Sequence, residues 1–247
     1  MKAVILAGGR GTRLAPYTAV LPKPLVPIGD IPILEVIIRQ LIASGFTSVT
    51  LTLGHLGELI RAYFAARKAL TSRIDFQFVD EEQPTGTAGS LRLVNDLPET
   101  FLVMNGDVLT TIDYQKLWDF HRASGALVTI AGHQKPVNID LGVLRLRDGE
   151  VIDYIEKPRY VYPVSMGVYV YDRRALEYIP AGERFDFPDL VLKLIANRKK
   201  VACFESEAIW LDIGRREDYA EAQEIFEKNQ PLFRMAECPP KPPTKPM

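Results

Sequence analysis

Apolar residues recur along the first half of the chain with two alternating periods. Between residues 33 and 44 they fall three or four positions apart, as at Ile33, Ile37 and Leu41, and this spacing predicts an amphipathic helix. Shorter apolar or alternating runs are typical of strands. The predicted strands are 3–6, 48–53, 74–79, 101–105 and 126–131, and the predicted helices are 33–44, 56–66, 87–95 and 113–124. Strands that alternate with helices predict a parallel sheet covered by helices.

A different pattern begins after residue 131. Two apolar segments flank Asp148-Gly149, and an Asp-Gly pair in that position is a strong signal for a β-hairpin. The predicted strands of this part are 141–146, 151–155, 164–171 and 200–205, and the predicted helices are 186–198 and 216–228. We therefore expect an α/β fold with a Rossmann-like, mostly parallel sheet flanked by helices and with an inserted antiparallel β region.

The end of the chain has a composition of its own. Residues 237–247 contain five prolines in eleven positions, which disfavours regular structure and predicts a disordered tail. Neither an internal repeat nor a linker divides the preceding residues. We therefore expect a single domain over residues 1–236.

The charge balance narrows the range of partners. The 247 residues include 30 Lys and Arg against 31 Asp and Glu, whereas nucleic-acid-binding domains usually carry a basic excess. No apolar run approaches the roughly 20 residues of a membrane span, and the first residues are expected to form a strand and a turn, not a signal peptide. With only Cys203 and Cys238, no disulfide framework is expected. These features favour a cytoplasmic location and exclude nucleic acid and membrane as partners.

Glycines follow the first predicted strand directly. Gly8, Gly9 and Gly11 allow the backbone to approach a ligand closely, and their N–H groups can converge on phosphate oxygens. Their spacing matches neither GxGxxG nor GxxxxGK[ST], which excludes Rossmann dinucleotide binding and a P-loop. The alternative interpretation is a tight turn without a ligand.

A proline-rich segment comes next and contains one lysine. Pro22 and Pro24 flank Lys23, and we expect them to prevent a helix and to hold the lysine on a rigid, extended segment. A preorganised lysine suits a fixed phosphate contact. The alternative is a solvated lysine in a surface loop.

Two aspartates stand where a metal ion could bind. Asp107 follows the strand at 101–105, and Asp212 precedes the last predicted helix. Mg²⁺ takes one or two carboxylates together with phosphate oxygens and water, although Asp is also common in caps and turns. The three histidines are scattered, which argues against zinc, and for His55, near a strand end, a structural role is favoured.

Two further segments could contact a substrate. The small residues of Pro84-Thr85-Gly86-Thr87 leave room for a flat base, or they form a plain strand-to-helix turn. Glu156-Lys157-Pro158 ends a predicted hairpin strand, where an exposed ion pair is the ordinary alternative.

Together these motifs resemble a known family. GGRGTRLAPYT followed by LPKPLVPI is similar to the N-terminal signature of the sugar-1-phosphate nucleotidylyltransferases, and the similarity continues to about Phe226. The segments PTGTAGSL, NGD, EKP and WLDIGRREDY match further motifs of that family. GTAG forms of the loop look most like guanylyltransferases that activate mannose- or heptose-type sugars, and uridylyl or thymidylyl transfer is the alternative. Leu141 and Ser165 depart from the family pattern at the sugar pocket.

The resemblance implies a reaction and a set of site residues. The reaction is NTP plus sugar 1-phosphate giving NDP-sugar and pyrophosphate, with Mg²⁺ as cofactor. The implied catalytic residues are Arg13, Lys23, Asp107 and Asp212, of which the two aspartates are the metal ligands. The implied nucleotide-binding residues are Leu6, Ala7, Gly8, Gly9, Gly11, Thr12, Arg13, Lys23, Pro84, Gly86, Thr87 and Asp107. The implied sugar-phosphate-binding residues are Gly142, Glu156, Lys157 and Gly167.

Two rival functions are weighed against this one. An NAD-linked oxidoreductase on a similar sheet lacks its GxGxxG fingerprint here. A regulatory protein that binds nucleotide sugars without turnover would not need Lys23, Asp107, Lys157 and Asp212 together. The sequence leaves open whether the chain forms a homo-oligomer.

Overall fold

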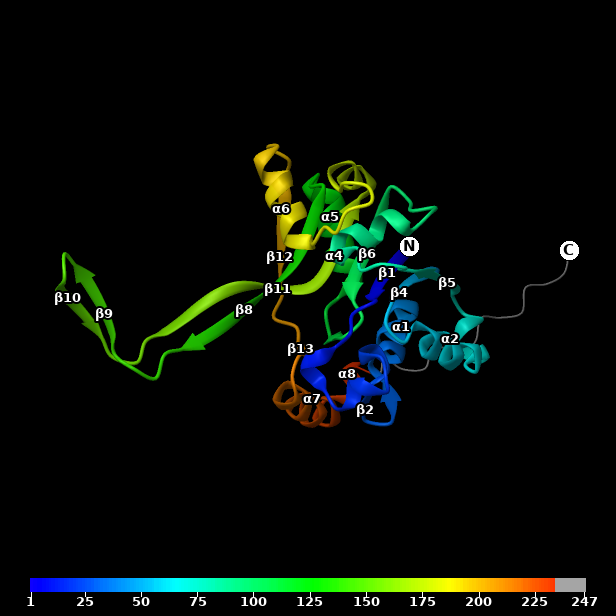
Figure 1. Cartoon of the computed structure of the whole chain (residues 1–247), viewed down its shortest axis with the longest axis horizontal. Helices are drawn as coiled ribbons and strands as arrows, with labels where there is room; N and C mark the ends of the chain where they lie inside the picture. Colours follow the sequence, from blue (N-terminus) through cyan, green and yellow to red (C-terminus); the bar gives the residue numbers. More distant parts are fainter. Residues whose placement is uncertain (234–247) are drawn as a thin grey trace, which may run out of the picture.

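The computed structural model describes residues 1–233, and a seven-stranded sheet runs through it (Figure 1). The strand order is β12-β8-β11-β6-β1-β4-β5. The strands are β1 (Lys2–Ala7), β4 (Ser48–Leu53), β5 (Asp75–Asp80), β6 (Thr100–Asn105), β8 (Val128–Asn138), β11 (Arg159–Asp172) and β12 (Val201–Glu205). Only β11 runs antiparallel to its neighbours, so the predicted mostly parallel α/β sheet is confirmed.

Helices cover both faces of this sheet. They are α1 (Ile33–Ala43), α2 (Gly57–Ala65), α3 (Lys68–Thr71), α4 (Gly86–Gly89), α5 (Tyr114–Ser124), α6 (Phe187–Ala196), α7 (Arg216–Lys228) and α8 (Gln230–Phe233). One buried core joins the sheet to α1, α2, α5 and α7, and a second joins its other face to α4 and α6. Successive side chains of β1 pack into opposite cores: Ile5 belongs to the first core and Val4 to the second. None of the helices in residues 1–233 is long and apolar enough to cross a membrane.

Local sequence signals explain where several helices begin and end. The Asp113 carboxylate caps α5, as predicted, by accepting a hydrogen bond from the Lys116 N–H at 3.0 Å. Gly125 ends the same helix with φ +65°, and Gly45, with φ +84°, follows α1. In contrast, the helix predicted at 87–95 is wrong in part: α4 gives way to a 3-10 helix at Ser90–Leu93, and the chain is already extended at Val94.

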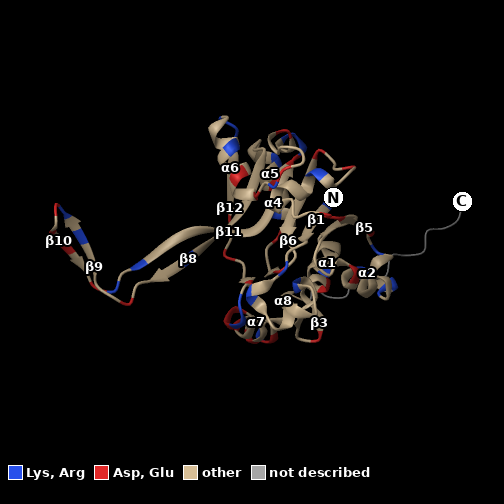
Figure 2. Ribbon diagram, in the orientation of Figure 1, with Lys and Arg blue, Asp and Glu red and all other residues tan. Residues whose placement is uncertain are grey.

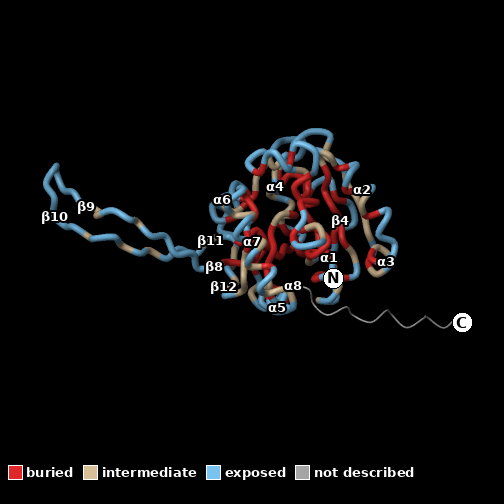
Figure 3. The backbone as a smooth tube through the Cα atoms, turned by 90° about the horizontal axis from the view of Figure 1, so that it is seen from below, coloured by how far each residue is buried: buried red, intermediate tan, exposed pale blue. Residues whose placement is uncertain are grey.

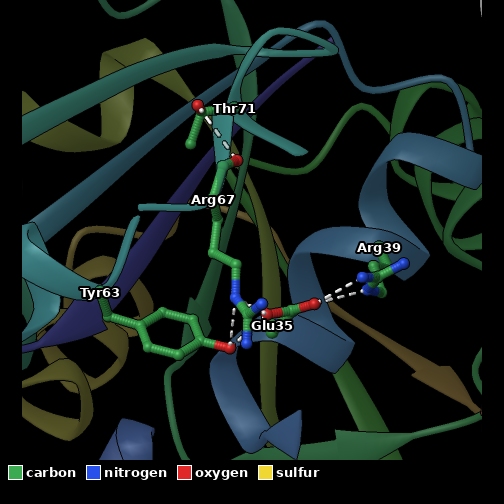
Figure 4. A network of polar contacts seen from close by, with 5 residues as sticks. All are labelled: Glu35, Arg39, Tyr63, Arg67 and Thr71. Atoms are coloured by element: carbon green, nitrogen blue, oxygen red, sulfur yellow. Dashed lines mark hydrogen bonds and ion pairs between the residues drawn. The ribbon is translucent and has the colours of Figure 1, made fainter. Parts of the chain in front are cut away.

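A buried charge network ties α1 to α2 on one face of the sheet (Figure 4). Glu35 is 1% exposed, and its carboxylate accepts hydrogen bonds from Arg39 and from the Tyr63 hydroxyl. Arg67 adds an ion pair at 3.4 Å. Burial and the bond to Glu35 together raise the pKa of Tyr63. The buried carboxylate is therefore compensated by partners from both helices, which fixes the helices beside β4.

Two strands are much longer than the sequence pattern predicts. We expected strands at 126–131 and 164–171, but β8 and β11 continue as a two-stranded arm that leaves the body of the molecule (Figures 1 and 3). Lys135, Pro136 and Pro163 weaken the strand signal, although a two-stranded ladder with open edges tolerates proline. The hairpin β9 (Val143–Arg147) and β10 (Glu150–Ile155) lies at its far end.

The hairpin itself is confirmed. Asp148 and Gly149 have φ of 50° and 89°, the left-handed pair that a tight two-residue turn requires. The hairpin is one of three two-stranded sheets in the described residues. The other two are β2 (Pro27–Ile28) with β3 (Ile31–Pro32), and β7 (Val108–Thr110) with β13 (Trp210–Asp212). The tail predicted at 237–247 lies outside the described residues.

Candidate active site

A pocket of about 730 Å³ opens at the carboxyl ends of the central parallel strands. Open α/β sheets bind ligands at this edge because the loops that follow the strands converge there. All twelve residues predicted to bind the nucleotide line the pocket: Leu6, Ala7, Gly8, Gly9, Gly11, Thr12, Arg13, Lys23, Pro84, Gly86, Thr87 and Asp107. The structure therefore brings together segments that lie up to a hundred residues apart in the sequence.

Close backbone packing shapes the glycine loop. A Cβ on Gly54, at the end of β4, would lie 2.7 Å from the Gly8 carbonyl oxygen, so a side chain there would displace the loop. Gly11 adopts φ +62° and begins the 3-10 turn Thr12–Leu14. This turn carries Arg13 into the pocket lining. Gly11 and Gly54 are thus required by the loop geometry itself, not only by a ligand, whereas a Cβ on Gly9 would meet nothing within 4 Å.

Lys23 is fixed in the pocket wall, but not on an extended segment. The prediction that Pro22 and Pro24 prevent any helical turn is wrong, since Lys23–Leu25 forms a single 3-10 turn. The two prolines do not oppose this turn, because its hydrogen bonds run from Leu25 N–H to Pro22 O (2.8 Å) and from Val26 N–H to Lys23 O (3.0 Å). Lys23 is 7% exposed, and its ammonium group forms an ion pair with Asp107.

Asp212 is held beside Asp107 by backbone pairing. The strand β13 pairs with β7, so that Asp212 lies opposite Val108, and the Ile213 N–H donates to the Asp107 carbonyl oxygen at 3.5 Å. Partial burial and the neighbouring Asp107 raise the pKa of Asp212, while Lys23 and Arg13 act in the opposite direction. Asp212 is not among the residues that line the pocket, but its carboxylate lies close enough to Asp107 for their two negative charges to interact.

This donor set fits a hard divalent cation. Residues 1–233 contain no group of three or more His, Cys, Asp or Glu side chains that could hold a metal without other ligands. Two carboxylates completed by phosphate oxygens and water are the usual arrangement for Mg²⁺. Asp107 and Asp212 are therefore the residues that would hold such an ion, with Lys23 bound to the same Asp107 carboxylate.

Another part of the pocket wall is built from the start of α4 and the loop before it. The Thr87 N–H donates to Asp186 at 3.0 Å, and the Thr87 hydroxyl accepts from the Phe187 N–H at 2.8 Å. The bond from Thr87, followed by the charge of Arg184, lowers the pKa of Asp186. Gly86, with φ +84°, passes so close to the segment before α6 that a Cβ would lie 2.6 Å from the Phe185 carbonyl oxygen. Contacts with α6 thus fix the shape of the loop.

The Glu81 carboxylate faces this part of the pocket as well. One of its oxygens accepts from the Thr85 hydroxyl at 2.9 Å, and the other would lie 2.9 Å from a Cβ on Gly8. The Glu81 carboxylate, a hydrogen-bond acceptor, thus lies between the glycine loop and the loop before α4.

Sequence reasoning missed several lining residues, namely Gly54, His55, Glu81, Glu82, Asn105, Arg184 and Asp186. Most follow or end a strand at the same edge of the sheet, and that position could have identified them. For His55 a structural role was favoured, yet it lines the pocket and its N–H donates to the Gly8 carbonyl oxygen at 3.4 Å. No local signal marks Arg184 and Asp186, because only tertiary packing brings them to this pocket.

The four residues predicted to bind the sugar phosphate are divided between two places. Gly167, with φ +74°, lies in the body, where a Cβ would approach the Asn105 amide nitrogen to 2.7 Å. Gly142, Glu156 and Lys157 lie on the arm, where the hairpin β9–β10 joins the β8–β11 ladder, and none of them lines the pocket.

The sequence is similar to those of known proteins. The family model described as Nucleotidyl transferase matches residues 2–229. A D-glycero-alpha-D-manno-heptose 1-phosphate guanylyltransferase of Aneurinibacillus thermoaerophilus is 32% identical over 226 residues, which cover 90% of this chain and 97% of that protein. A UTP–glucose-1-phosphate uridylyltransferase of Synechocystis sp. is 32% identical over 241 residues. The match covers 90% of this chain but only 62% of the relative's length.

A solved structure shows the same fold. HddC from Yersinia pseudotuberculosis superimposes with a TM-score of 0.70 and 27% identity, over 91% of this chain and 99% of that one. The same protein has also been solved in complex with GMP-PN.

Proposed function

Because the chain belongs to the nucleotidyl transferase family, we propose that it transfers a nucleoside monophosphate from an NTP to a sugar 1-phosphate and releases pyrophosphate. The observation that carries this proposal is the single pocket lined by all twelve predicted nucleotide residues, with the Lys23–Asp107 ion pair among them and the Asp212 carboxylate close to Asp107. A nucleotide fits a cavity of this volume.

In the proposed reaction, an oxygen of the sugar phosphate attacks the α-phosphorus of the NTP. The bond from the α-phosphorus to the bridging oxygen on the opposite side breaks, and pyrophosphate leaves with that oxygen. The nucleophile is already ionised at neutral pH, so no general base is required. Arg13 and Lys23 stabilise the charge that develops on the phosphates, and their fixed positions spare the cost of reorganisation. Mg²⁺ bound to Asp107 and Asp212 would supply Lewis-acid stabilisation of the phosphate oxygens.

We propose GTP as the nucleotide and a mannose- or heptose-type phosphate as the acceptor. Guanine presents N–H donors, and the Glu81 carboxylate, close to Gly8, is an acceptor within the pocket. The heptose-phosphate guanylyltransferase that is 32% identical, and HddC with its GMP-PN complex, support the same nucleotide.

A uridylyltransferase is the second candidate, because the Synechocystis relative of equal identity is named for UTP and glucose 1-phosphate. Thymidylyl transfer is retained beside it as an alternative. A nucleotide-consuming reaction of this kind is consistent with a cytoplasmic location, which we also propose.

One experiment tests the proposal. Five NTPs are combined with a panel of sugar 1-phosphates in the presence of Mg²⁺, and pyrophosphate release is measured. We expect the highest rate with GTP and a mannose- or heptose-type phosphate. Activity with UTP or dTTP but not with GTP would overturn the assignment of the base, and no release with any pair would overturn the reaction.

A further inference from the structure

The arm is exposed along its whole length. No residue from 134 to 165 is buried (Figure 3). Eighteen large apolar side chains are exposed in the described residues, and nine of them lie on the arm: Val137, Leu141, Leu144, Leu146, Val151, Ile152, Tyr154, Val161 and Tyr162. Apolar exposure concentrated in this way marks a surface that packs against another protein surface.

The hairpin at the end of the arm has one apolar face. Leu144 pairs with Tyr154 and Leu146 with Val151, so these four side chains share a face. The other face carries the Arg145–Asp153 ion pair at 3.7 Å. Figure 2 shows basic and acidic residues along this hairpin. Because an isolated two-stranded hairpin is marginally stable in water, this apolar face requires a cover.

The same arm carries a ready-formed polar cluster. The Tyr154 hydroxyl donates to the Glu156 carboxylate at 3.0 Å and lies so close to Gly142 that a Cβ there would clash with it. Lys157 adopts φ +44°, which is rare for a residue with a side chain, and its ammonium group lies 4.0 Å from Glu156. Gly142, Glu156 and Lys157, the three residues that sequence reasoning assigns to the sugar phosphate, are thus assembled together outside any described pocket of their own chain.

The body has the complementary surface. An apolar groove adjoins the nucleotide pocket, and the two share Thr87 and Asn105. The groove is bordered by Val191 and Leu192 of α6, and Leu192 is 66% exposed. It therefore offers an apolar surface directly beside the position where the second substrate must enter.

The arm does not reach this groove in its own chain. Strands β8 and β11 pair without a break from Ser165–Gly132, where the arm leaves the groove, to Arg159–Asn138 near the cluster. At about 3.3 Å per residue, these six steps carry the cluster roughly 20 Å away. To fold back, the arm would have to break its ladder of hydrogen bonds.

We propose that a second copy of this chain receives the arm. In a two-fold symmetric dimer, the apolar face of the hairpin packs on α6 of the partner, and Glu156 and Lys157 reach the partner's nucleotide pocket, where they bind the sugar 1-phosphate. Each active site then takes its nucleotide residues from one chain and its sugar-phosphate residues from the other. This inference rests on the proposed function, since the cluster is assigned to that substrate.

Heterodimers isolated with two different affinity tags test this arrangement. The first combines a Lys23→Ala chain with a Lys157→Ala chain. The rate of pyrophosphate release is measured at saturating GTP and at a sugar 1-phosphate concentration well below the wild-type KM, where the Lys157→Ala defect is fully expressed. If the sites are shared, one of the two sites has an intact pocket and an intact arm, and we expect about half of the wild-type rate. If each chain serves its own pocket, both sites are defective and the rate stays at that of the single-variant homodimers.

The matched heterodimer combines a wild-type chain with a Lys23→Ala/Lys157→Ala chain. The shared arrangement leaves both of its sites defective, whereas independent chains would retain half of the wild-type rate. That retained half, or an inactive first heterodimer, would overturn the inference. A wild-type protein without turnover would instead overturn the proposed function, so the two failures are distinguishable.

Light scattering of the wild-type protein provides a second measurement. We expect twice the chain mass of 27.7 kDa, and a monomer would overturn the proposal. Leu144→Glu, on the apolar face of the hairpin, should give a monomer that still binds GTP but has lost turnover. Leu59→Glu, an exposed apolar residue of α2, is the matched control and should remain dimeric and active.

Discussion

The body and the arm differ in how they hold the residues assigned to the substrates. In the body, strand ends anchored between two buried cores hold the nucleotide residues, and Lys23 is itself buried beside Asp107. On the arm, a two-stranded ladder without a buried residue holds Glu156 and Lys157. A site built in the body is complete as the chain folds, whereas the residues on the arm are positioned only when another surface covers the arm.

The largest effect is expected in the body. Lys23→Ala should lower kcat by roughly 10²–10³, as is typical when one preorganised charge stabiliser is removed. Asp107→Asn and Asp212→Asn should each nearly abolish Mg²⁺-dependent pyrophosphate release, because each substitution removes a charged ligand. Steady-state kinetics at saturating GTP and sugar phosphate measure these changes.

A control from the same loop separates catalysis from general charge. Arg10 lines the pocket but is exposed, so Arg10→Ala should change kcat by much less than Lys23→Ala. Near-normal turnover of Lys23→Ala would contradict the role of that lysine.

On the arm, the expected effect is smaller and concerns one substrate. A hydrogen bond to a charged group contributes about 1.5–3 kcal/mol, so Lys157→Ala should raise the KM for the sugar 1-phosphate by roughly 10–10²-fold. The affinity for GTP, measured by calorimetry, should not change, because the nucleotide pocket lies in the body. Arg147→Ala, at the tip of the same hairpin, is the control and should have little effect. Equal losses of affinity for both substrates would contradict the division between body and arm.

The sequence predicted the body better than the arm, and the reason is physical. The helix at 216–228 and the strand at 48–53 have the predicted bounds, because a regular apolar period reports burial in a core. The outer parts of β8 and β11 pack against no core, so they left no periodic signal and no strand was predicted there.

The site residues, too, could be predicted only where the local sequence carries a signal. Gly8, Gly11 and Lys23 stand out because they combine a strand end with unusual local chemistry. Arg184 and Asp186 reach the pocket only through the packing of α6 against the loop at residues 84–87, and no local pattern encodes such a long-range contact. The position of Glu156 and Lys157 relative to the pocket was beyond sequence reasoning, because it depends on the direction in which the arm leaves the sheet.

A third, more modest effect concerns the choice of base. Glu81→Gln keeps the size of the side chain but replaces an acceptor oxygen and removes the charge that favours the N–H donors of guanine. We expect kcat/KM for GTP to fall about 10-fold relative to that for UTP. Glu82→Gln is the control, since Glu82 is exposed and should not alter this ratio. An equal decline with both nucleotides would show that Glu81 acts on loop structure, through Thr85, and not on the base.

The smallest effect concerns the stability of the body, at the part of β8 that lies inside the sheet. His121 of α5 is buried, and its ring contacts the Thr129 hydroxyl of β8 at 2.9 Å. Burial lowers the pKa of His121 below its usual value, and the charge of Asp172 opposes this shift in part. Below about pH 6.5 the unfolded chain therefore binds a proton that the folded chain resists, so the contribution to stability is complete above that pH and decreases as the pH falls.

Urea unfolding at pH 7.5 and at pH 5.5 measures this contribution. The wild-type protein should lose more stability between the two conditions than His121→Gln does, although the variant is less stable at pH 7.5. Thr129→Val removes the hydrogen-bond partner but keeps the imidazole, so it should retain the pH dependence of the wild-type protein. If wild type and His121→Gln lose stability in parallel, other groups govern the pH response. Leu144→Glu should show the wild-type pH dependence, because the arm carries no histidine and makes no contribution to the core around His121.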